Sequence, residues 1–376
     1  MSWKGSIVDQ RHEFVALAQQ EGVNRRDLCR RFGISPQTGY KWLGRVTDEL
    51  ENWSRDRSRR PLYSPGRSSD DLESAVLAVR RAHPAWGARK IAWTLEQQGV
   101  DAPACSTIHA VLQRHGCIVP RETRAKATGR FEHPAPNLVW QMDFKGRFDM
   151  VGGRYCHPLT IVDDHSRYAV CLEACDNETT DTVKRRLIGT FHRYGLPEVF
   201  LVDNGSPWGG SDHRTWTQLG VWLLKLGIGV IHSRPYHPQT RGKNERFHRT
   251  LIDEVLALKR SRSIPEVQRA FDAWRPGYNT IRPHEGIGMN PPASRYQPSA
   301  RKMPDRIMPI EYADTEIVRT VARTKSYFAF KGRMWKVPQA FQGERVAIRP
   351  TEKDATYGVF FGAHKITEIN LKNVDQ

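Results

Sequence analysis

The sequence of 376 residues lacks any long hydrophobic run. Its most apolar stretch, Val221–Ile231, carries Lys225 in its middle and is too short to cross a bilayer. The N-terminal segment MSWKGSIVDQRHEF contains no apolar run typical of a signal peptide. These two absences predict a cytoplasmic protein that has no membrane partner.

Cysteine is scarce and irregularly placed. The chain has six cysteines, with no CxxC pair and no regular framework, which fits a reducing compartment better than a disulfide scaffold. The nearest approach to a zinc site is the set Cys105, His109, His115 and Cys117. Its spacing fits no regular zinc finger, and it lies within a helical pattern, so a zinc module is not expected.

Acidic residues are too few to balance the basic ones, since 41 Asp and Glu stand against 58 Lys and Arg, for a formal net charge of +17. A nucleic acid is the simplest partner for such a chain, although charge alone says nothing about catalysis. Hydrophobic residues make up 39% of the sequence, which excludes global disorder. The length predicts two to four domains.

Residues 1–53 are predicted to form a helix-turn-helix DNA-binding domain. A helix over 25–32 is followed by Gly-Ile-Ser-Pro, in which Ser35 suits the N-cap and Pro36 the first position of a helix over 37–43. The alternative is a small helical bundle with a basic, solvent-exposed face. Polar residues expected to face the major groove are Gln37, Thr38 and Lys41.

A second helix-turn-helix domain is predicted over residues 70–119, with Ser106 as the N-cap of its last helix. Basic, proline-containing linkers flank it at 54–69 and 120–136, and the arginines of the first are suited to phosphates. The candidates for groove contacts in this domain are Thr107, His109 and Gln113.

Residues 137–296 alternate strands with helices. Three antiparallel strands, two of them connected through Gly152-Gly153, precede alternating helices and strands, which predicts an α/β domain with a mixed, five-stranded sheet. Strands are predicted at 138–144, 155–163, 168–174, 199–202 and 228–232. Helices are predicted at 180–194, 212–226 and 242–259. A linker over 297–316 leads to 317–376, where five short runs separated by turn residues predict a small all-β, SH3-like barrel.

Three acidic residues stand at distinctive places in the α/β segment. Asp143 lies near the end of the first strand, Asp203 follows the fourth strand, and Glu245 lies in the first turn of the long helix. Each alone has another explanation, as a strand-end surface residue, a turn residue and a helix-dipole acid respectively. Converging carboxylates repel one another without cations, so together they imply bound metal, and oxygen ligands favour Mg²⁺ or Mn²⁺.

The motifs around these acids resemble those of the DDE transposases and retroviral-type integrases. The matching segments are WQMDFKG at 140–146, LTIVDDHSRYAV at 159–170, LVDNGSPW at 201–208, RPYHPQTRGKNERFHRTL at 234–251 and YNTIRPHEGIGMNPPASRY at 278–296. Within that superfamily the chain most resembles bacterial insertion-sequence transposases with N-terminal helix-turn-helix modules. The resemblance implies a ribonuclease-H-like catalytic core over 137–296.

The sequence departs from the retroviral pattern in two ways. Forty-one residues separate Asp203 from Glu245, against roughly 35 in the retroviral members, and the extra length falls around 208–215, where a loop insertion is tolerated. There is also no His-His-Cys-Cys zinc module of the retroviral kind. The assignment of the three acids survives both departures.

The resemblance implies that Asp143, Asp203 and Glu245 are catalytic residues and the ligands of two Mg²⁺ ions per site, with Mn²⁺ as a substitute. The implied reaction cleaves the ends of an insertion sequence and joins the 3′ ends to target DNA by phosphodiester transfer. Residues predicted to contact DNA near the scissile phosphate are His237, Gln239, Lys243 and Arg249. Arg249 has the alternative of pairing with Glu245.

Three further acids are weaker candidates for the site. Asp164 is predicted to cap the turn before Ser166, and Asp253 and Glu254 lie about two turns beyond Glu245 without its Gly-Lys-Asn context.

The implied partners are double-stranded DNA, as terminal inverted repeats and target, and further copies of the chain. At least a dimer is expected on DNA, because two ends must be brought together. The implied location is the bacterial cytoplasm, at the nucleoid. Two alternatives remain open: a catalytically inactive, sequence-specific DNA-binding relative, and a ribonuclease-H-like nuclease without strand transfer.

Overall fold

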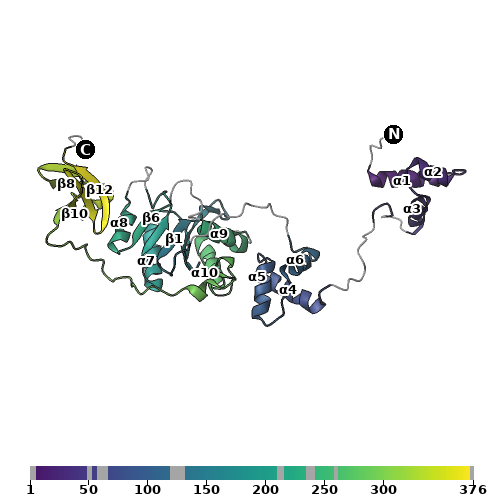
Figure 1. Ribbon diagram of the computed structural model, residues 1–376, viewed down its shortest axis with the longest axis horizontal. Coiled ribbons are helices and arrows are strands. Elements are labelled where there is room, and N and C mark those ends of the chain that lie inside the picture. Colours follow the sequence, from purple (N-terminus) through teal and green to yellow (C-terminus); the bar gives the residue numbers. More distant parts are fainter. Residues whose placement is uncertain are drawn as a thin grey trace. The chain divides into compact units, whose positions relative to one another are not determined.

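The computed structural model describes residues 6–48, 53–56, 67–118, 132–209, 216–233, 242–257 and 261–372 (Figure 1). The chain divides into two compact units, Met1–Arg67 and Ser68–Gln376. Every helix within these ranges is too short or too polar to span a bilayer.

The first unit is a three-helix module, α1 (Ile7–Ala18), α2 (Arg25–Arg31) and α3 (Pro36–Asp48). Its helices begin where local chemistry satisfies their free N–H groups: the Asn24 side chain accepts from two N–H groups of α2, and the Ser35 hydroxyl accepts from Thr38 N at 3.2 Å. Phe14 and Leu28 are buried among the three helices. The helix-turn-helix prediction is confirmed.

A second helical module opens the other unit, with α4 (Asp70–Ala82), α5 (Ala88–Gln97) and α6 (Cys105–Arg114). The buried Glu73 of α4 ties α6 in place, because Arg114 and His115 contact its two carboxylate oxygens. The prediction that Ser106 caps α6 is wrong. The helix begins earlier, at Cys105, with Ala104 at the N-cap and no side-chain cap, so Ser106 already lies within its first turn.

The α/β region is built on a mixed sheet of five main strands in the order β4-β3-β1-β5-β6. Strand β1 pairs antiparallel with β3 and parallel with β5, which in turn is parallel to β6. The bounds are β1 (Val139–Phe144), β3 (Tyr155–Asp163), β4 (Ala169–Cys175), β5 (Val199–Val202) and β6 (Gly229–His232). The sequence missed a sixth, two-residue strand, β2 (Phe148–Asp149), and it is β2, not β1, that the Gly152-Gly153 turn joins to β3.

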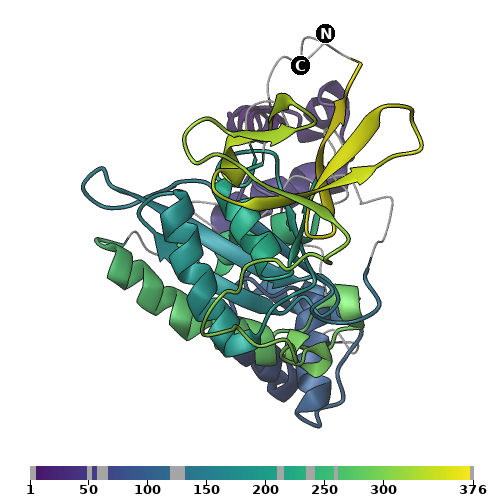
Figure 2. The same cartoon turned by 90° about the vertical axis from the view of Figure 1, so that its left-hand side faces the viewer.

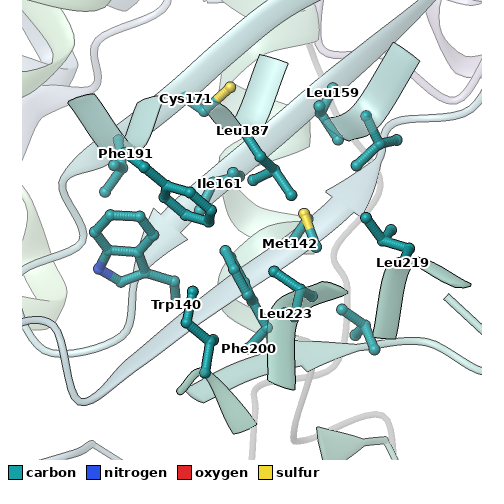
Figure 3. Packing of buried hydrophobic residues seen from close by; sticks show 14 of the residues in the cluster. Trp140, Met142, Leu159, Ile161, Cys171, Leu187, Phe191, Phe200, Leu219 and Leu223 are labelled. Carbon is teal, nitrogen blue, oxygen red and sulfur yellow. The ribbon is translucent and has the colours of Figure 1, made fainter. Parts of the chain in front are cut away.

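Helices cover both faces of this sheet (Figure 1). On one face α7 (Thr180–Tyr194) and α8 (Gln218–Lys225) bury Phe191 and Leu223 against Trp140, Ile161 and Phe200 of the sheet (Figure 3). The opposite face packs on α9 (Gly242–Leu251), its π-helical continuation η2 (Ile252–Leu256) and α10 (Ile264–Thr280). Short 3₁₀ turns follow at η3 (Glu285–Ile287) and η4 (Pro292–Arg295). The α7 bounds agree with the prediction, whereas α8 is shorter than expected and 210–215 lie outside the described residues.

The C-terminal region is all-β, as predicted (Figure 2). One sheet has the order β12-β11-β10-β7 and the other is the β8-β9 hairpin, so the region has one strand more than the sequence indicated. The two sheets enclose an apolar core that includes Phe341 and Phe361. The elements are β7 (Ile317–Thr320), β8 (Tyr327–Phe330), β9 (Arg333–Lys336), η5 (Gln339–Phe341), β10 (Arg345–Pro350), β11 (Thr356–Phe361) and β12 (His364–Asn370).

Candidate active site

Strand register brings two of the three predicted acids to the same edge of the sheet. Parallel strands β1 and β5 pair Trp140 with Phe200 and Gln141 with Leu201. Continuing that register by two residues places Asp143 opposite Asp203, which directly follows β5. Both residues are partly exposed. The carboxyl ends of parallel strands are where α/β sheets place their ligands.

Glu245 is presented by α9, and a hydrogen-bonded link holds that helix to the strands. The buried Thr160 of β3 is the cross-strand partner of Asp143, and its hydroxyl donates to the Asp143 carbonyl at 2.9 Å. The same hydroxyl lies 2.7 Å from Nε2 of His248. Because the single hydroxyl proton goes to the carbonyl, His248 Nε2–H is the donor of the second bond. Glu245 is exposed one turn before His248, on the adjoining side of the helix.

The chemistry of these side chains fits a hard divalent cation. All three offer carboxylate oxygens, the ligands that Mg²⁺ and Mn²⁺ take in proteins. Within the described ranges, however, no group of three or more His, Cys, Asp or Glu side chains is close enough to hold a metal ion. The structure therefore supports the pairing of Asp143 with Asp203 through strand register, and leaves the convergence of Glu245 as a prediction.

Two consecutive buried carboxylates, Asp163 and Asp164, lie at the end of β3, and the structure corrects the role assigned to one of them. Asp163, not Asp164, caps the turn, because its carboxylate accepts from the backbone N–H and the hydroxyl of Ser166 and from Asn137 N. The sequence alone could not distinguish Asp163 from Asp164 as the capping residue, because both lie next to the turn. Successive side chains of a strand point to opposite faces, so only one of the two can reach the N–H groups of the turn. Burial raises the pKa of Asp163 despite these bonds.

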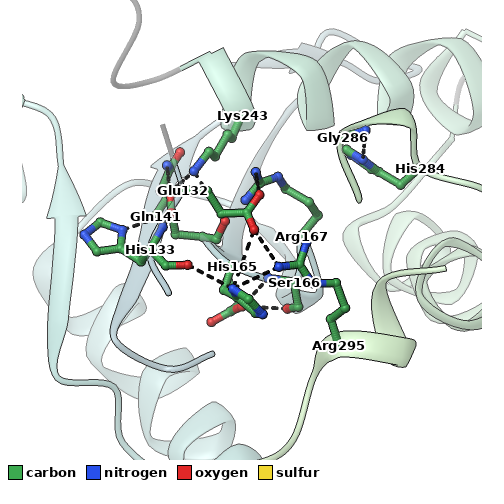
Figure 4. Close-up of polar contacts among 12 residues, drawn as sticks. Glu132, His133, Gln141, His165, Ser166, Arg167, Lys243, His284, Gly286 and Arg295 are labelled. Carbon is green, nitrogen blue, oxygen red and sulfur yellow. Dashed lines mark hydrogen bonds and ion pairs between the residues drawn. The ribbon is translucent and has the colours of Figure 1, made fainter. Parts of the chain in front are cut away.

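Asp164 has a different environment, in which three side chains converge on it. Its carboxylate accepts from Gln141 Nε2 at 2.7 Å, from Lys243 Nζ at 2.5 Å and from the backbone N–H of His133 at 2.9 Å, and His133 Nδ1 lies at 2.9 Å (Figure 4). Burial alone would raise the pKa of Asp164, but the bonds from Lys243 and His133 and the lysine charge outweigh it, so the pKa lies below its ordinary value.

Lys243, predicted to contact DNA, is therefore engaged within the protein, with 16% of its side chain exposed. Arg249 and Glu245 are both exposed, and the ion pairs found among the described residues include none between them. Glu254 is occupied by Arg282 Nε at 2.9 Å and Trp274 Nε1 at 2.8 Å, which removes it as a rival of Glu245. His237 and Gln239 lie outside the described residues.

The residues predicted to contact the major groove differ in how far their side chains are exposed. Gln37 and Lys41 on α3, and His109 and Gln113 on α6, are exposed. The other two, Thr38 and Thr107, are half-buried, and the Thr38 hydroxyl lies 2.9 Å from that of Ser35. Sequence reasoning overlooked Tyr40, which is 50% exposed on α3.

Sequence reasoning also missed the polar residues that connect α9 to the sheet: Thr160, His248, Gln141 and His133. A usable signal existed for two of them. Gln141 and Thr160 are polar residues that stand between apolar neighbours in their strands, and a buried polar side chain needs a hydrogen-bond partner. No comparable signal pointed to His133, which lies in a segment that reads as linker.

Family models match most segments of the chain. Integrase core domain models match residues 133–238 and 226–292, and the model of the IS481 family transposase C-terminal domain matches 316–376. Homeodomain-like domain models match 8–51 and 38–112. Together with the strand order, these matches confirm the predicted arrangement of helix-turn-helix modules, ribonuclease-H-like core and all-β C-terminal region.

Curated relatives include proteins of bacterial insertion elements. The chain is 32% identical over 160 residues to an uncharacterized 39.2 kDa protein of insertion element IS476 from Xanthomonas euvesicatoria, which covers 42% of this chain and 44% of that protein. It is 21% identical over 375 residues to a putative transposase for insertion sequence element IS5376 from Geobacillus stearothermophilus, covering 96% of this chain and 88% of the relative. The chain thus spans less than half of the first of these relatives.

Similar solved structures include the simian T-cell lymphotropic virus intasome in complex with PP2A regulatory subunit B56 gamma, with a TM-score of 0.37 and 17% identity over 77% of this chain and 96% of that chain. Another is the HTLV-2 integrase catalytic core domain in complex with magnesium, in its trimeric form, with a TM-score of 0.32 and 15% identity over 44% of this chain and 99% of that chain.

Proposed function

We propose that the chain is an insertion-sequence transposase of the DDE superfamily, which cleaves the ends of an insertion sequence and joins their 3′ ends to target DNA; the matches to integrase core and IS481 transposase C-terminal models support this. The observation that supports this most directly is the parallel register of β1 and β5, which, continued two residues beyond the Gln141–Leu201 pair, leads to Asp143 and Asp203. The link from Thr160 to His248 supports the place of Glu245 on the adjacent helix.

Asp143, Asp203 and Glu245 would hold Mg²⁺, or Mn²⁺ in its place, as two ions per site. When bound, such ions supply a low-pKa attacking hydroxyl and stabilise negative charge on the leaving oxygen of a phosphodiester. The protein's part is to hold the carboxylates at one edge of the sheet and to orient the DNA strand there. In the proposed complex Arg249, exposed one turn beyond Glu245, binds backbone phosphate, as do His237 and Gln239, whereas Lys243 is already bound to Asp164.

The two helical modules would select the terminal inverted repeats. The exposed polar side chains of α3 and α6 are suited to base edges in the major groove, and the charge of +17 supports binding to the phosphate backbone of both end and target DNA. The proposed working form on DNA is at least a dimer, because two ends must be held together, and the proposed location is the nucleoid.

The test is strand transfer of a labelled duplex carrying the element's own ends into a plasmid, with Mg²⁺ and with Mn²⁺. Glu245→Gln should lower joining by more than about 100-fold, because loss of residues that only orient metal ligands already costs about 10- to 100-fold. Glu311→Gln, the same change at an exposed residue of the connector, is the matched control and should join DNA like the wild type.

Each alternative has its own result in this assay. Tight binding of the ends without nicking or joining under either metal would identify a DNA-binding relative instead. Cleavage that never proceeds to joining would identify a nuclease. Joining that persists in Glu245→Gln would remove Glu245 from the site.

A further inference from the structure

We propose that Asp164 and Thr160 are positioning residues, which hold α9 against β1 and so set where Glu245 lies relative to Asp143. This proposal rests on the proposed function. Lys243 and His248 are the residues of α9 that bind Asp164 and Thr160, and we call these two contacts the tethers of the helix. Neither Asp164 nor Thr160 would contact DNA or metal.

The two contacts join the same pair of elements at two points. Asp164 accepts from Gln141, which lies two residues before Asp143 on the same face of β1, and from Lys243, two residues before Glu245 on α9. Thr160 connects the Asp143 carbonyl to His248, three residues after Glu245. Each bridge therefore connects the strand of one predicted acid to the helix of another.

The tethers lie on opposite flanks of the buried stripe of α9. Phe247 and Leu251 form the apolar part of that stripe, and an apolar contact alone leaves a helix free to turn by small angles. Lys243 stands about 200° around the helix from Glu245, whereas His248 stands only about 60° from it. Because one tether lies on each flank, together they fix the rotation of α9 and hence the direction of Glu245.

Burial makes these contacts specific. The side chain of Asp164 is 1% exposed, and Thr160 is fully buried. A buried carboxylate that loses its cation, or a buried hydroxyl that loses its partners, costs free energy, so the helix has one favoured position in which both groups are satisfied.

The test combines a double-mutant cycle with hydrogen–deuterium exchange on the full-length protein. Asp164→Asn and Lys243→Met should each speed amide exchange in α9 and lower strand transfer about 10- to 100-fold, with a higher Mn²⁺ concentration for half-maximal rate. The double variant should be no slower than the slower single variant, because both changes break one tether. Affinity for the DNA ends should stay within about twofold of wild type. Asp305→Asn and Lys302→Met, both exposed, are the matched controls.

Thr160 provides an independent pair of variants if Asp164→Asn fails to fold. Thr160→Ser keeps the hydroxyl and should retain most activity, whereas Thr160→Val keeps the shape, loses the hydroxyl and should resemble Asp164→Asn in both exchange and metal requirement. Equal activity of the Ser and Val variants would overturn the role of Thr160.

Two further results test the contact between Lys243 and Asp164 and separate it from the proposed function. Suppose that Lys243→Met weakens DNA binding, leaves amide exchange in α9 unchanged, and lowers strand transfer by a factor that multiplies with the factor of Asp164→Asn in the double variant. Lys243 is then a DNA contact, and the positioning role is overturned. If the wild type joins no DNA, the proposed function fails, and exchange alone then decides: faster exchange in Asp164→Asn supports the tether, and unchanged exchange refutes it.

Discussion

At the scale of single residues, two neighbouring aspartates have pKa values shifted in opposite directions, because their hydrogen-bond and ion-pair partners differ. Asp163 and Asp164 are consecutive and both buried. Asp163 meets only neutral donors, and burial raises its pKa, whereas Asp164 meets the Lys243 ammonium and its pKa is lowered. The sequence gives the same residue type at both positions. Only their hydrogen-bond and ion-pair partners show that Asp163 caps the turn and that Asp164 binds the Lys243 ammonium.

His284 gives a pH prediction at the same scale. Burial, followed by the nearby charges of Arg282 and Arg167, lowers its pKa from 6.5 to about 3, and its Nδ1 accepts from Gly286 N at 3.1 Å. Between these pH values the unfolded chain binds a proton that the folded chain does not. The contribution of His284 to the free energy of unfolding should therefore be fully present above pH 6.5. It should fall by up to about 1.4 kcal/mol per pH unit as the pH decreases towards 3.

The measurement is urea unfolding at pH 7, 6, 5 and 4 for wild type and for His284→Asn, which keeps an acceptor for Gly286 N–H but does not titrate in this range. The wild type should lose more stability than the variant on acidification. Parallel pH profiles for the two proteins would contradict the assignment.

At the scale of elements, α3 contains two glycines that look alike in the sequence and differ in packing. A Cβ at Gly39 would lie 2.6 Å from Cys29 Sγ and 2.7 Å from Phe14 Cζ, whereas a Cβ at Gly44 meets nothing within 4 Å. Gly39 thus permits the close approach of α3 to the two helices before it.

Gly39→Ala should destabilise the first module by about 1–3 kcal/mol through overpacking. Gly44→Ala, the same change in the same helix, should stabilise it by about 0.5–1 kcal/mol, because alanine loses less backbone entropy in a helix. Hydrogen–deuterium exchange of the α1 and α2 amides in the full-length protein measures both. Equal effects of the two changes would show that Cys29 and Phe14 move aside for the added methyl group without a loss of stability.

Element prediction succeeded where the signal was local. The bounds of α7 follow from a capping Thr179 and a terminal Gly195, and β5 is a short apolar run between turn residues. It failed where a helix begins without a side-chain cap, as at α6, and where a strand was too short to show a period, as at β2.

At the scale of the whole molecule, the excess of positive charge predicts salt-dependent binding to DNA of any sequence. The linker 54–69 concentrates arginines, including Arg57, Arg59 and Arg60. Each phosphate contact contributes about 0.9 to the slope of log K against log salt, so replacing these three with Gln should reduce the slope by up to about 3.

Fluorescence anisotropy with a duplex of unrelated sequence, between about 50 and 200 mM salt, measures that slope. The matched control removes the same charge from the C-terminal region through Lys353→Gln, Lys365→Gln and Lys372→Gln, at lysines already paired with Glu368 or Asp354. It should change the slope less. Equal changes would show that overall charge, and not the linker, determines the binding.

The sequence by itself determined the order of domains, the all-β nature of the C-terminal region and the three acids as candidates, because caps, turn residues, hydrophobic periods and motif spacing act over a few residues. Only the tertiary structure decided that β1 and β5 are parallel neighbours in a register that leads to Asp143 and Asp203, that Asp163 rather than Asp164 caps the turn, and that Lys243 contacts a buried carboxylate. The reason is physical: strand register, burial and the partner of a charge depend on residues that lie far apart in the chain.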